Sequence, residues 1–224
     1  MDKRPESRVT ADIPVRIWGM DADGKPFFQS AMASSLSSEG AQLSQLHHSL
    51  KINDIIGIQY GDRKARFKVV WAKGSSAVGR NQIGVMILND ELAPWTELAS
   101  EKRRTGPRPD SEKRRFNRHK VQFPITISFP DPRRAHMQCS ATDIGGRGCY
   151  VESLVPLAIG SQVIITFWLD SEKNRTKAVV RTSDPGVGMG IEFTDLENQI
   201  QNQLQEYLEK VDKGFSKAAT NNAT

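Results

Sequence analysis

The two halves of this chain repeat one another, and the repeat limits the folds that the chain can adopt. Five segments of the first half recur in the second in the same order, 106 to 110 residues further on. They pair Arg8 with Arg118, Pro14–Ile17 with Pro124–Ile127, Gly40 with Gly148, Val69–Trp71 with Val179–Arg181, and Gly84 with Gly190. Ordered matches at nearly constant spacing indicate a duplicated domain.

Short runs rich in β-branched and aromatic residues fill both halves. In the second half they are QFPITISF, HMQCSATDI, GCYVES, QVIITFWL, RTKAVVRTS and GMGIEF, separated by Gly, Pro, Asp and Ser. This pattern favours an all-β antiparallel barrel or sandwich in each half. The period changes near the end, where Leu196, Ile200, Leu204 and Leu208 recur every four residues. That spacing predicts an amphipathic helix covering the second domain, and four anchors are too few to favour a coiled coil. A short helix is also predicted within residues 91–100.

The positive charge of the chain is concentrated between the halves. Residues 101–120 hold nine Lys or Arg against three Asp or Glu, whereas the whole chain has a net charge of +5. Such a stretch attracts an anionic partner or is simply a solvated linker. Pro107 and Pro109 interrupt it, so we predict an interdomain linker at residues 100–112. The two domains then span residues 1–99 and 113–211, and the tail at 212–224 is expected to be disordered.

Bulk properties narrow the class of protein. No apolar run is long enough to cross a bilayer, and MDKRPESR lacks the apolar stretch of a secretory signal, so we expect a cytoplasmic protein. Cys139 and Cys149 are too few for a disulfide scaffold or thiolate zinc site, and His47-His48 has no third ligand at suitable spacing. The sequence shows no phosphate-binding loop, nucleophile elbow or paired catalytic acids. We therefore expect no metal, no cofactor and no enzymatic activity.

Two pieces of the second half have the chemistry of a ligand site. Arg114, Arg115 and Arg118 precede its first strand, and residues 143–148, DIGGRG, form a glycine-rich turn between two predicted strands. Guanidinium groups bond to guanine O6 and N7, stack on purines or pair with phosphate, and a carboxylate such as Asp143 accepts from guanine N–H groups. Glycines allow backbone N–H groups to approach an anion, although glycines alone fit a tight hairpin equally well. Together the pieces suit a guanine nucleotide with more than one phosphate.

The order and spacing of these motifs resemble the PilZ domain family over residues 113–211. RxxxR at Arg114 and Arg118 is followed by the DxSxxG-like turn and by a final strand, Gly190-Ile191-Glu192-Phe193. The resemblance implies a six-stranded antiparallel barrel with a C-terminal helix. It also implies binding of the bacterial second messenger cyclic di-GMP, often as an intercalated dimer. The ligand-binding residues that it implies are Arg114, Arg115, Arg118, Asp143, Gly145 and Gly148.

The second half departs from the family motif at one position. Gly145 stands where the family has serine. Loss of one hydroxyl hydrogen bond should cost ~1 kcal/mol, or roughly fivefold in affinity, so binding is expected to be weakened rather than abolished.

The first half carries a degenerate version of the motif. Arg4 and Arg8 keep the RxxxR spacing, and Ser37 and Gly40 keep two positions of the turn, but Ser35 replaces its acidic residue. A lost hydrogen bond to a charged group costs more, ~1.5–3 kcal/mol. We predict all-β tandem PilZ-like barrels, with a weaker second site at Arg4, Arg8, Ser35, Ser37 and Gly40.

The functional prediction is a cyclic di-GMP receptor. Ligand binding would rearrange the domains or change contact with a protein partner in motility, exopolysaccharide or regulatory machinery. The alternative is a PilZ-like scaffold that binds its partner without ligand, which the departures at Gly145 and Ser35 favour. A third hypothesis, nucleic-acid binding by the basic stretch, is disfavoured because only Phe116 and Phe123 lie near it to stack on bases.

Overall fold

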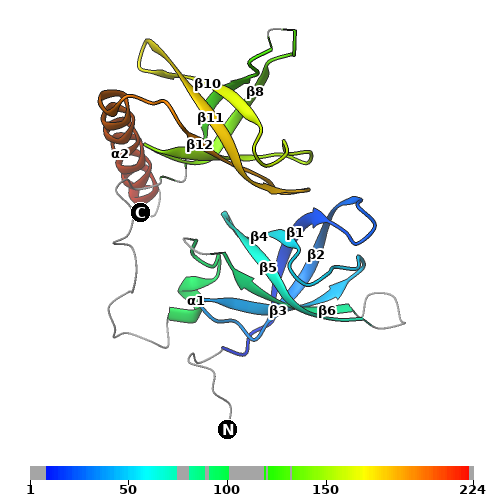
Figure 1. The fold of residues 1–224 in the computed structure, drawn as a ribbon. Helices are drawn as coiled ribbons and strands as arrows, with labels where there is room; N and C mark the ends of the chain where they lie inside the picture. Colours follow the sequence, from blue (N-terminus) through cyan, green and yellow to red (C-terminus); the bar gives the residue numbers. More distant parts are fainter. Residues whose placement is uncertain are drawn as a thin grey trace. The chain divides into compact units, whose positions relative to one another are not determined.

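The chain folds into two compact units, whose main boundary lies between Ser111 and Glu112. The structure is a computed structural model, and it describes residues 9–74, 81–88, 91–100, 119, 121–131 and 133–221. Figure 1 shows a β-barrel in each unit and one long helix on the second. Apart from Ser100, the linker expected at residues 100–112 lies outside the described residues, so its bounds stay a prediction.

Six antiparallel strands close into a barrel in the first unit, in the order β1-β2-β3-β6-β5-β4. Pairing of β1 with β4 completes the closure, which leaves no free sheet edge. A five-residue helix, α1 (Thr96–Ser100), follows the barrel where a short helix was expected. The strands are β1 Ile13–Met20, β2 Pro26–Ser34, β3 Gly40–Leu46, β4 Ile55–Tyr60, β5 Arg63–Lys73 and β6 Asn81–Ile87.

The second unit repeats this topology, with β7-β8-β9-β12-β11-β10 in a second closed barrel. Its strands are β7 Phe123–Ser128, β8 Met137–Gly145, β9 Gly148–Glu152, β10 Gln162–Leu169, β11 Glu172–Asp184 and β12 Gly188–Phe193. The helix α2 (Asn198–Asn221) is the last element of the described residues. Two six-stranded antiparallel barrels with a C-terminal helix confirm the predicted fold class.

Each barrel has its own core because its strands alternate between inward apolar and outward polar residues. In β1, Ile13, Val15 and Ile17 are buried. Phe123, Ile125 and Ile127 of β7 are buried at the matching positions, 110 residues later. The two sets belong to separate hydrophobic clusters, one for each unit.

The backbone pairing confirms the repeat at positions that can be compared directly. Val9 pairs with Leu36 in an isolated antiparallel bridge, and His119 pairs with Ile144 in the same way. These four residues are related by the spacings of 110 and 108 seen in the sequence. Because Arg8 and Arg118 lie outside the described residues, their own match is not compared.

One of the five sequence matches is wrong by a single residue. In the first barrel, Val69 pairs with Val85, which follows Gly84 in the sequence. In the second barrel, Ile191 follows Gly190 in the same way, and its partner is Val180. The true spacing in this strand is therefore 111 rather than 110. A bulge lies after Val69 in β5 and after Val180 in β11. Because side chains alternate between the two faces of a strand, a match shifted by one residue aligned inward residues of one strand with outward residues of the other.

The helix α2 packs on the second barrel through the predicted apolar stripe. Leu204 and Leu208 are fully buried in the core, and Leu196 joins the same cluster. The Tyr207 ring meets the Phe123 ring edge-on, with 6.1 Å between centroids. The helix continues to Asn221, although we expected disorder from residue 212; Lys and Ala in this stretch are good helix formers. Within the described residues, no helix is long and apolar enough to cross a membrane.

Candidate functional site

The predicted arginines cannot be located directly. Arg114, Arg115 and Arg118, and Arg4 and Arg8 of the weaker site, all lie outside the described residues. The structure does describe the residue that follows each RxxxR motif, namely His119 and Val9. Their roles as ligand-binding residues stay predictions.

His119 ties the end of the arginine motif to the glycine-rich turn. Its N–H donates to the Ile144 carbonyl at 2.8 Å, and the Ile144 N–H donates to the His119 carbonyl at 3.1 Å. Ile144 lies between the motif residues Asp143 and Gly145 and is fully buried. Two motifs that are 25 residues apart in sequence are thus joined, at His119, by a pair of backbone hydrogen bonds.

The motif DIGGRG spans the tight hairpin between β8 and β9. Gly145 pairs with Gly148, so only Gly146 and Arg147 form the connection. Asp143 is partly exposed just before it, where a bulge separates it from Ala141 in the register. Arg147 at the tip is exposed, whereas the three glycines are buried. The hairpin therefore carries an exposed guanidinium and a partly exposed carboxylate whose Oδ1 atom is buried.

Strand β12 holds this hairpin in place. The Phe193 N–H donates to the Arg147 carbonyl at 2.9 Å. A Cβ at Gly148 would lie 2.3 Å from the carbonyl oxygen of Ile191, so no larger residue fits there without backbone movement. Gly148 is therefore required by the packing of β9 against β12, whatever else it does.

A row of residues that the sequence did not single out extends from Asp143 across the sheet. Asp143 pairs with Tyr150, Tyr150 with Gly190, and Gly190 with Thr182. The Tyr150 hydroxyl lies 3.4 Å from Asp184 Oδ2, and the Gly190 N–H donates to Thr182 Oγ1 at 3.0 Å. Tyr150 is 5% exposed although it is not part of the barrel core. Alternation within GCYVES would have placed Tyr150 on the outer face, but nothing in the sequence linked it to Asp184.

The equivalent turn of the first barrel is looser and uses its serine internally. Five residues, Ser35 to Glu39, join β2 to β3, and Ser35 adopts a left-handed φ of 52°. The Ser37 hydroxyl accepts from the Gly40 N–H at 3.1 Å and the Glu39 N–H at 3.3 Å. The Trp95 indole N–H donates to the Ser37 carbonyl at 2.9 Å. Ser37 is buried, so its hydroxyl braces the turn.

The outer surfaces beside the two turns differ in charge. At the turn tip, exposed Glu39 of the first barrel stands where the second has Arg147. Beside the turn, Arg181 Nε donates to Glu192 Oε2 at 2.5 Å in the second barrel.

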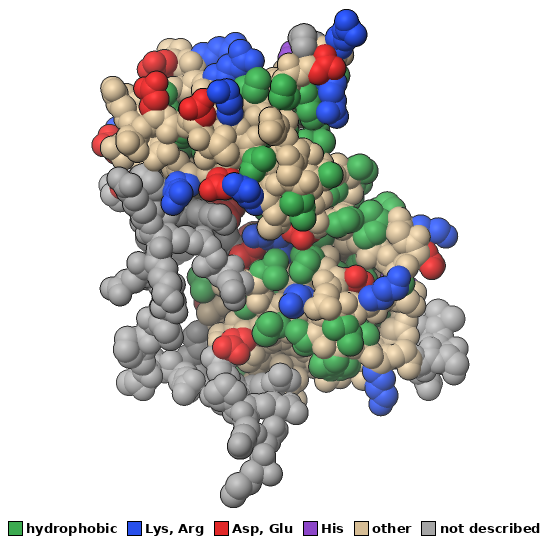
Figure 2. Space-filling view, viewed as in Figure 1, with side chains coloured by type: hydrophobic (Ala, Val, Ile, Leu, Met, Phe, Trp, Pro, Cys, Tyr) green, Lys and Arg blue, Asp and Glu red, His purple; other side chains and the backbone are tan. Residues whose placement is uncertain are grey.

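The first barrel has exposed apolar side chains in place of that ion pair. They are Val70 (39% exposed) and Met86 (44% exposed), and the neighbouring Trp71 is also 39% exposed. Figure 2 shows apolar side chains exposed among charged ones on the molecular surface. The first barrel thus keeps the strand topology of the second without the ion pair between Arg181 and Glu192.

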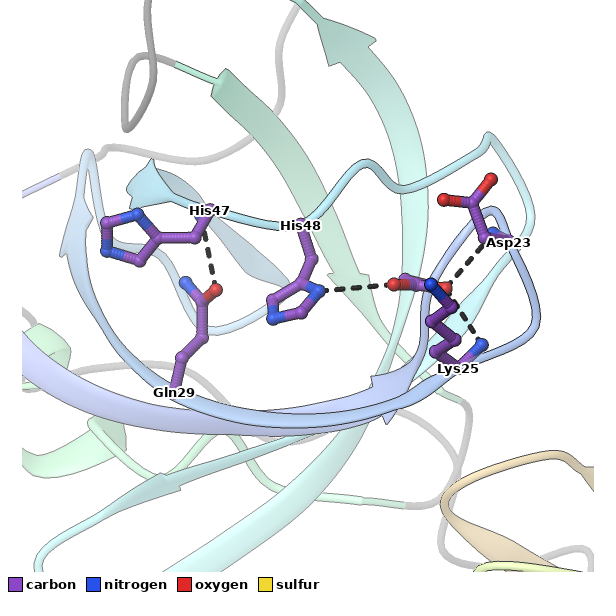
Figure 3. A network of polar contacts seen from close by, with 6 residues as sticks. Asp23, Lys25, Gln29, His47 and His48 are labelled. Carbon is purple, nitrogen blue, oxygen red and sulfur yellow. Dashed lines mark hydrogen bonds and ion pairs between the residues drawn. The ribbon is translucent and has the colours of Figure 1, made fainter.

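The paired histidines belong to a structural network at the β1–β2 turn (Figure 3). His48 Nδ1 lies 3.2 Å from Asp21 Oδ2, and its ring stacks on Phe27. A hydrogen bond from the Lys25 N–H holds the pKa of Asp21 below its ordinary value; partial burial opposes this, and His48 adds to it. Within the described part of the chain, no group of three or more His, Cys, Asp or Glu could hold a metal ion.

The two cysteines lie inside β8 and β9 and are not joined in a disulfide. Cys149 is buried in the core, and burial raises the pKa of the Cys139 thiol. Neither lies in the row of residues beside the turn.

Among the comparisons with known proteins, one family model matches the second barrel. The model of the PilZ domain matches residues 112–210. A search of curated proteins gives no match. Among solved structures, the chain is similar to Escherichia coli YcgR in complex with c-di-GMP, with 11% identity, a TM-score of 0.45, and coverage of 93% of this chain and 87% of that one.

Two further solved structures resemble most of the chain. The inhibitor of motility MotI/DgrA of Bacillus subtilis has 12% identity and a TM-score of 0.38, covering 90% of this chain and 96% of that one. PlzA of Borreliella burgdorferi, solved with c-di-GMP, has 13% identity and a TM-score of 0.31, covering 91% and 94%. Residues 112–210 are thus a PilZ domain, and the barrel that precedes them has the same strand topology.

Proposed function

We propose that this protein is a receptor for cyclic di-GMP and that the second barrel holds the ligand. The PilZ match covers that barrel, and its hairpin carries Asp143 and Arg147 beside the end of the arginine motif. No catalytic role is proposed for either barrel. The protein would act in the cytoplasm as a sensor that passes the signal to a protein partner.

The observation that best supports the site is the bridge between His119 and Ile144. Arg118 directly precedes His119 in the sequence, and Arg114 is four residues earlier. Both are proposed as ligand-binding residues of this site. Guanidinium groups over the phosphates and guanine edges, with Asp143 accepting from a guanine, form a complementary set.

The second barrel is proposed as the principal site because the first lacks the complementary charge. Ser35 replaces Asp143, and Glu39 replaces Arg147 at the turn tip. A carboxylate at the tip repels phosphate, whereas a guanidinium attracts it. The Ser37 hydroxyl is already bonded within its own turn. We therefore propose that any binding by the first barrel is weaker.

Isothermal titration of the purified chain with cyclic di-GMP tests the proposal. We expect saturable binding, with GTP and linear diguanylate as controls that bind far less. The basic stretch at residues 101–120 would bind any polyanion, so the titration is repeated at two salt concentrations. Absence of saturable binding at tens of micromolar ligand, or equal binding of all three nucleotides, would refute the receptor.

A second candidate function is a scaffold that binds its partner without ligand. The observation in its favour is the apolar group of Val70, Trp71 and Met86 on the first barrel, in the place of an ion pair in the second. Exposed apolar side chains that gather on a surface often mark protein contacts. Partner capture that is equally strong with and without cyclic di-GMP, and is lost in Trp71→Ser, would favour this candidate over the receptor.

A further inference from the structure

A glutamine on α2 reaches into the second barrel and contacts His119. Gln205 Nε2 lies 2.8 Å from His119 Nε2. An amide nitrogen only donates, so His119 Nε2 is the acceptor of this contact. His119 is 7% exposed, so this bond is shielded from water. Gln205 thus makes a polar contact between α2 and His119, the residue that follows the arginine motif.

The contact continues to the hairpin through the backbone of His119. The same residue makes two hydrogen bonds with Ile144, at 2.8 and 3.1 Å, and Ile144 is next to Asp143. The helix α2, His119 and the hairpin are therefore connected by successive hydrogen bonds through the side chain and the backbone of His119. The position of the start of this barrel is fixed from both sides, by α2 and by β8.

Gln205 is not needed simply to hold α2 on the barrel. Leu204 and Leu208 on the same helix are fully buried in the core and supply the apolar contact. Gln205 Oε1 is buried and has no hydrogen-bond partner among the described residues, which is unfavourable. Gln205 Nε2 also lies 3.4 Å from Glu209 Oε1 on the same helix, a longer contact than the 2.8 Å to His119. An apolar residue there would avoid this penalty, so the amide is best explained by what its nitrogen does for His119.

The first barrel lacks this arrangement. Val9 occupies the place of His119 and pairs with Leu36, but its side chain offers no hydrogen-bonding atom. The helix that follows that barrel, α1, has five residues, and 24 residues form α2. The polar contact therefore occurs in the barrel that matches the PilZ domain and carries Asp143.

We propose that Gln205 is a positioning residue for the ligand site. Its contact with His119 holds the bridge between His119 and Ile144, and so the hairpin residue Asp143, in place, and ligand binding in turn steadies α2. This inference rests on the proposed function, because it assigns a role within the cyclic di-GMP site.

The test compares two leucine variants on the same helix. Gln205→Leu keeps the size of the side chain but removes the bond to His119, whereas Gln203→Leu changes an exposed glutamine two residues away. Titration with cyclic di-GMP, on samples shown to be folded by circular dichroism, should give an affinity roughly fivefold weaker for Gln205→Leu and within twofold of the unaltered chain for Gln203→Leu. Equal affinities for all three proteins would overturn the inference.

A second measurement needs no variant and covers the case in which Gln205→Leu does not fold. Amide hydrogen exchange of residues 198–211 in the unaltered chain should slow when cyclic di-GMP is added, because a fixed His119 steadies the helix. Unchanged exchange at saturating ligand would overturn the inference while leaving the receptor intact. If the unaltered chain binds no ligand at all, the receptor proposal itself has failed.

Discussion

Gly148 approaches Ile191 so closely that a Cβ on residue 148 would lie 2.3 Å from the Ile191 carbonyl oxygen. The first barrel repeats the relationship, since a Cβ at Gly40 would lie 2.1 Å from the carbonyl oxygen of Val85. The last glycine of the motif is therefore needed for the hairpin to lie against the neighbouring strand. This need holds even in the barrel whose ligand motif is degenerate.

Replacing Gly148 by alanine should accordingly destabilise the second barrel. The contact is with backbone, which cannot move aside as a flexible side chain could, so a loss of about 1–3 kcal/mol is expected. Urea unfolding followed by circular dichroism measures it. Gly74→Ala is the control, because a Cβ there meets nothing within 4 Å. Equal stabilities of the two variants would contradict the packing role.

Ser37→Ala should destabilise the first barrel without changing its affinity for ligand. The hydroxyl accepts from two backbone N–H groups inside a buried turn, and its loss should cost about 0.5–1.5 kcal/mol. Tryptophan fluorescence during urea unfolding follows this barrel, which holds Trp18, Trp71 and Trp95. Ser49→Ala, at an exposed serine, serves as the reference. A Ser37→Ala chain as stable as the reference would show that the hydroxyl is not a brace.

Much of the fold follows from the sequence because a duplicated, alternating pattern admits few solutions. Short runs of β-branched and aromatic residues in both halves predicted an antiparallel barrel or sandwich, and the resemblance to the PilZ family implied the barrel. The bulges after Val69 and Val180 were not predictable, since a bulge depends on how two strands pair. That is why one strand was matched one residue out of place.

The candidate site was predicted only in part, for a related reason. Asp143 and the glycines belong to a contiguous motif, so their chemistry can be read from the sequence. Tyr150 and Asp184 are 34 residues apart and meet only through the register of β9, β12 and β11. Gln205 was within a correctly predicted helix, but its contact with His119 depends on the rotation of that helix against the barrel.

The stability of the β1–β2 turn should depend on pH through Asp21. Its pKa in the folded chain is lowered, chiefly by the Lys25 N–H, so the charged form stabilises the fold. That contribution is fully present above the unfolded value of 3.8 and is lost as pH falls through the lower folded pKa. Asp21→Asn should therefore be less stable than the unaltered chain at pH 7, and the difference should shrink below pH ~4.

Urea midpoints measured from pH 7 to pH 3 check this expectation. Asp23→Asn, at an exposed carboxylate in the same turn, is the matched control. Should the difference between Asp21→Asn and the unaltered chain stay constant across that range, the carboxylate would not be the titrating group.

The choice of the second barrel as the ligand site predicts unequal effects of equivalent substitutions. Asp143→Ala removes the carboxylate proposed to accept from guanine, and a lost bond between charged and polar groups is worth ~1.5–3 kcal/mol, or roughly 10- to 150-fold in affinity. Ser35→Ala, the equivalent change in the first barrel, should leave the main binding event unaltered. Arg118→Ala and Arg4→Ala form a second pair with the same expected contrast. Gly145→Ser should tighten binding up to about fivefold if the hydroxyl reaches the ligand. Titration calorimetry on all five variants measures the affinities. Comparable losses from Asp143→Ala and Ser35→Ala would contradict the choice of the second barrel as the principal site.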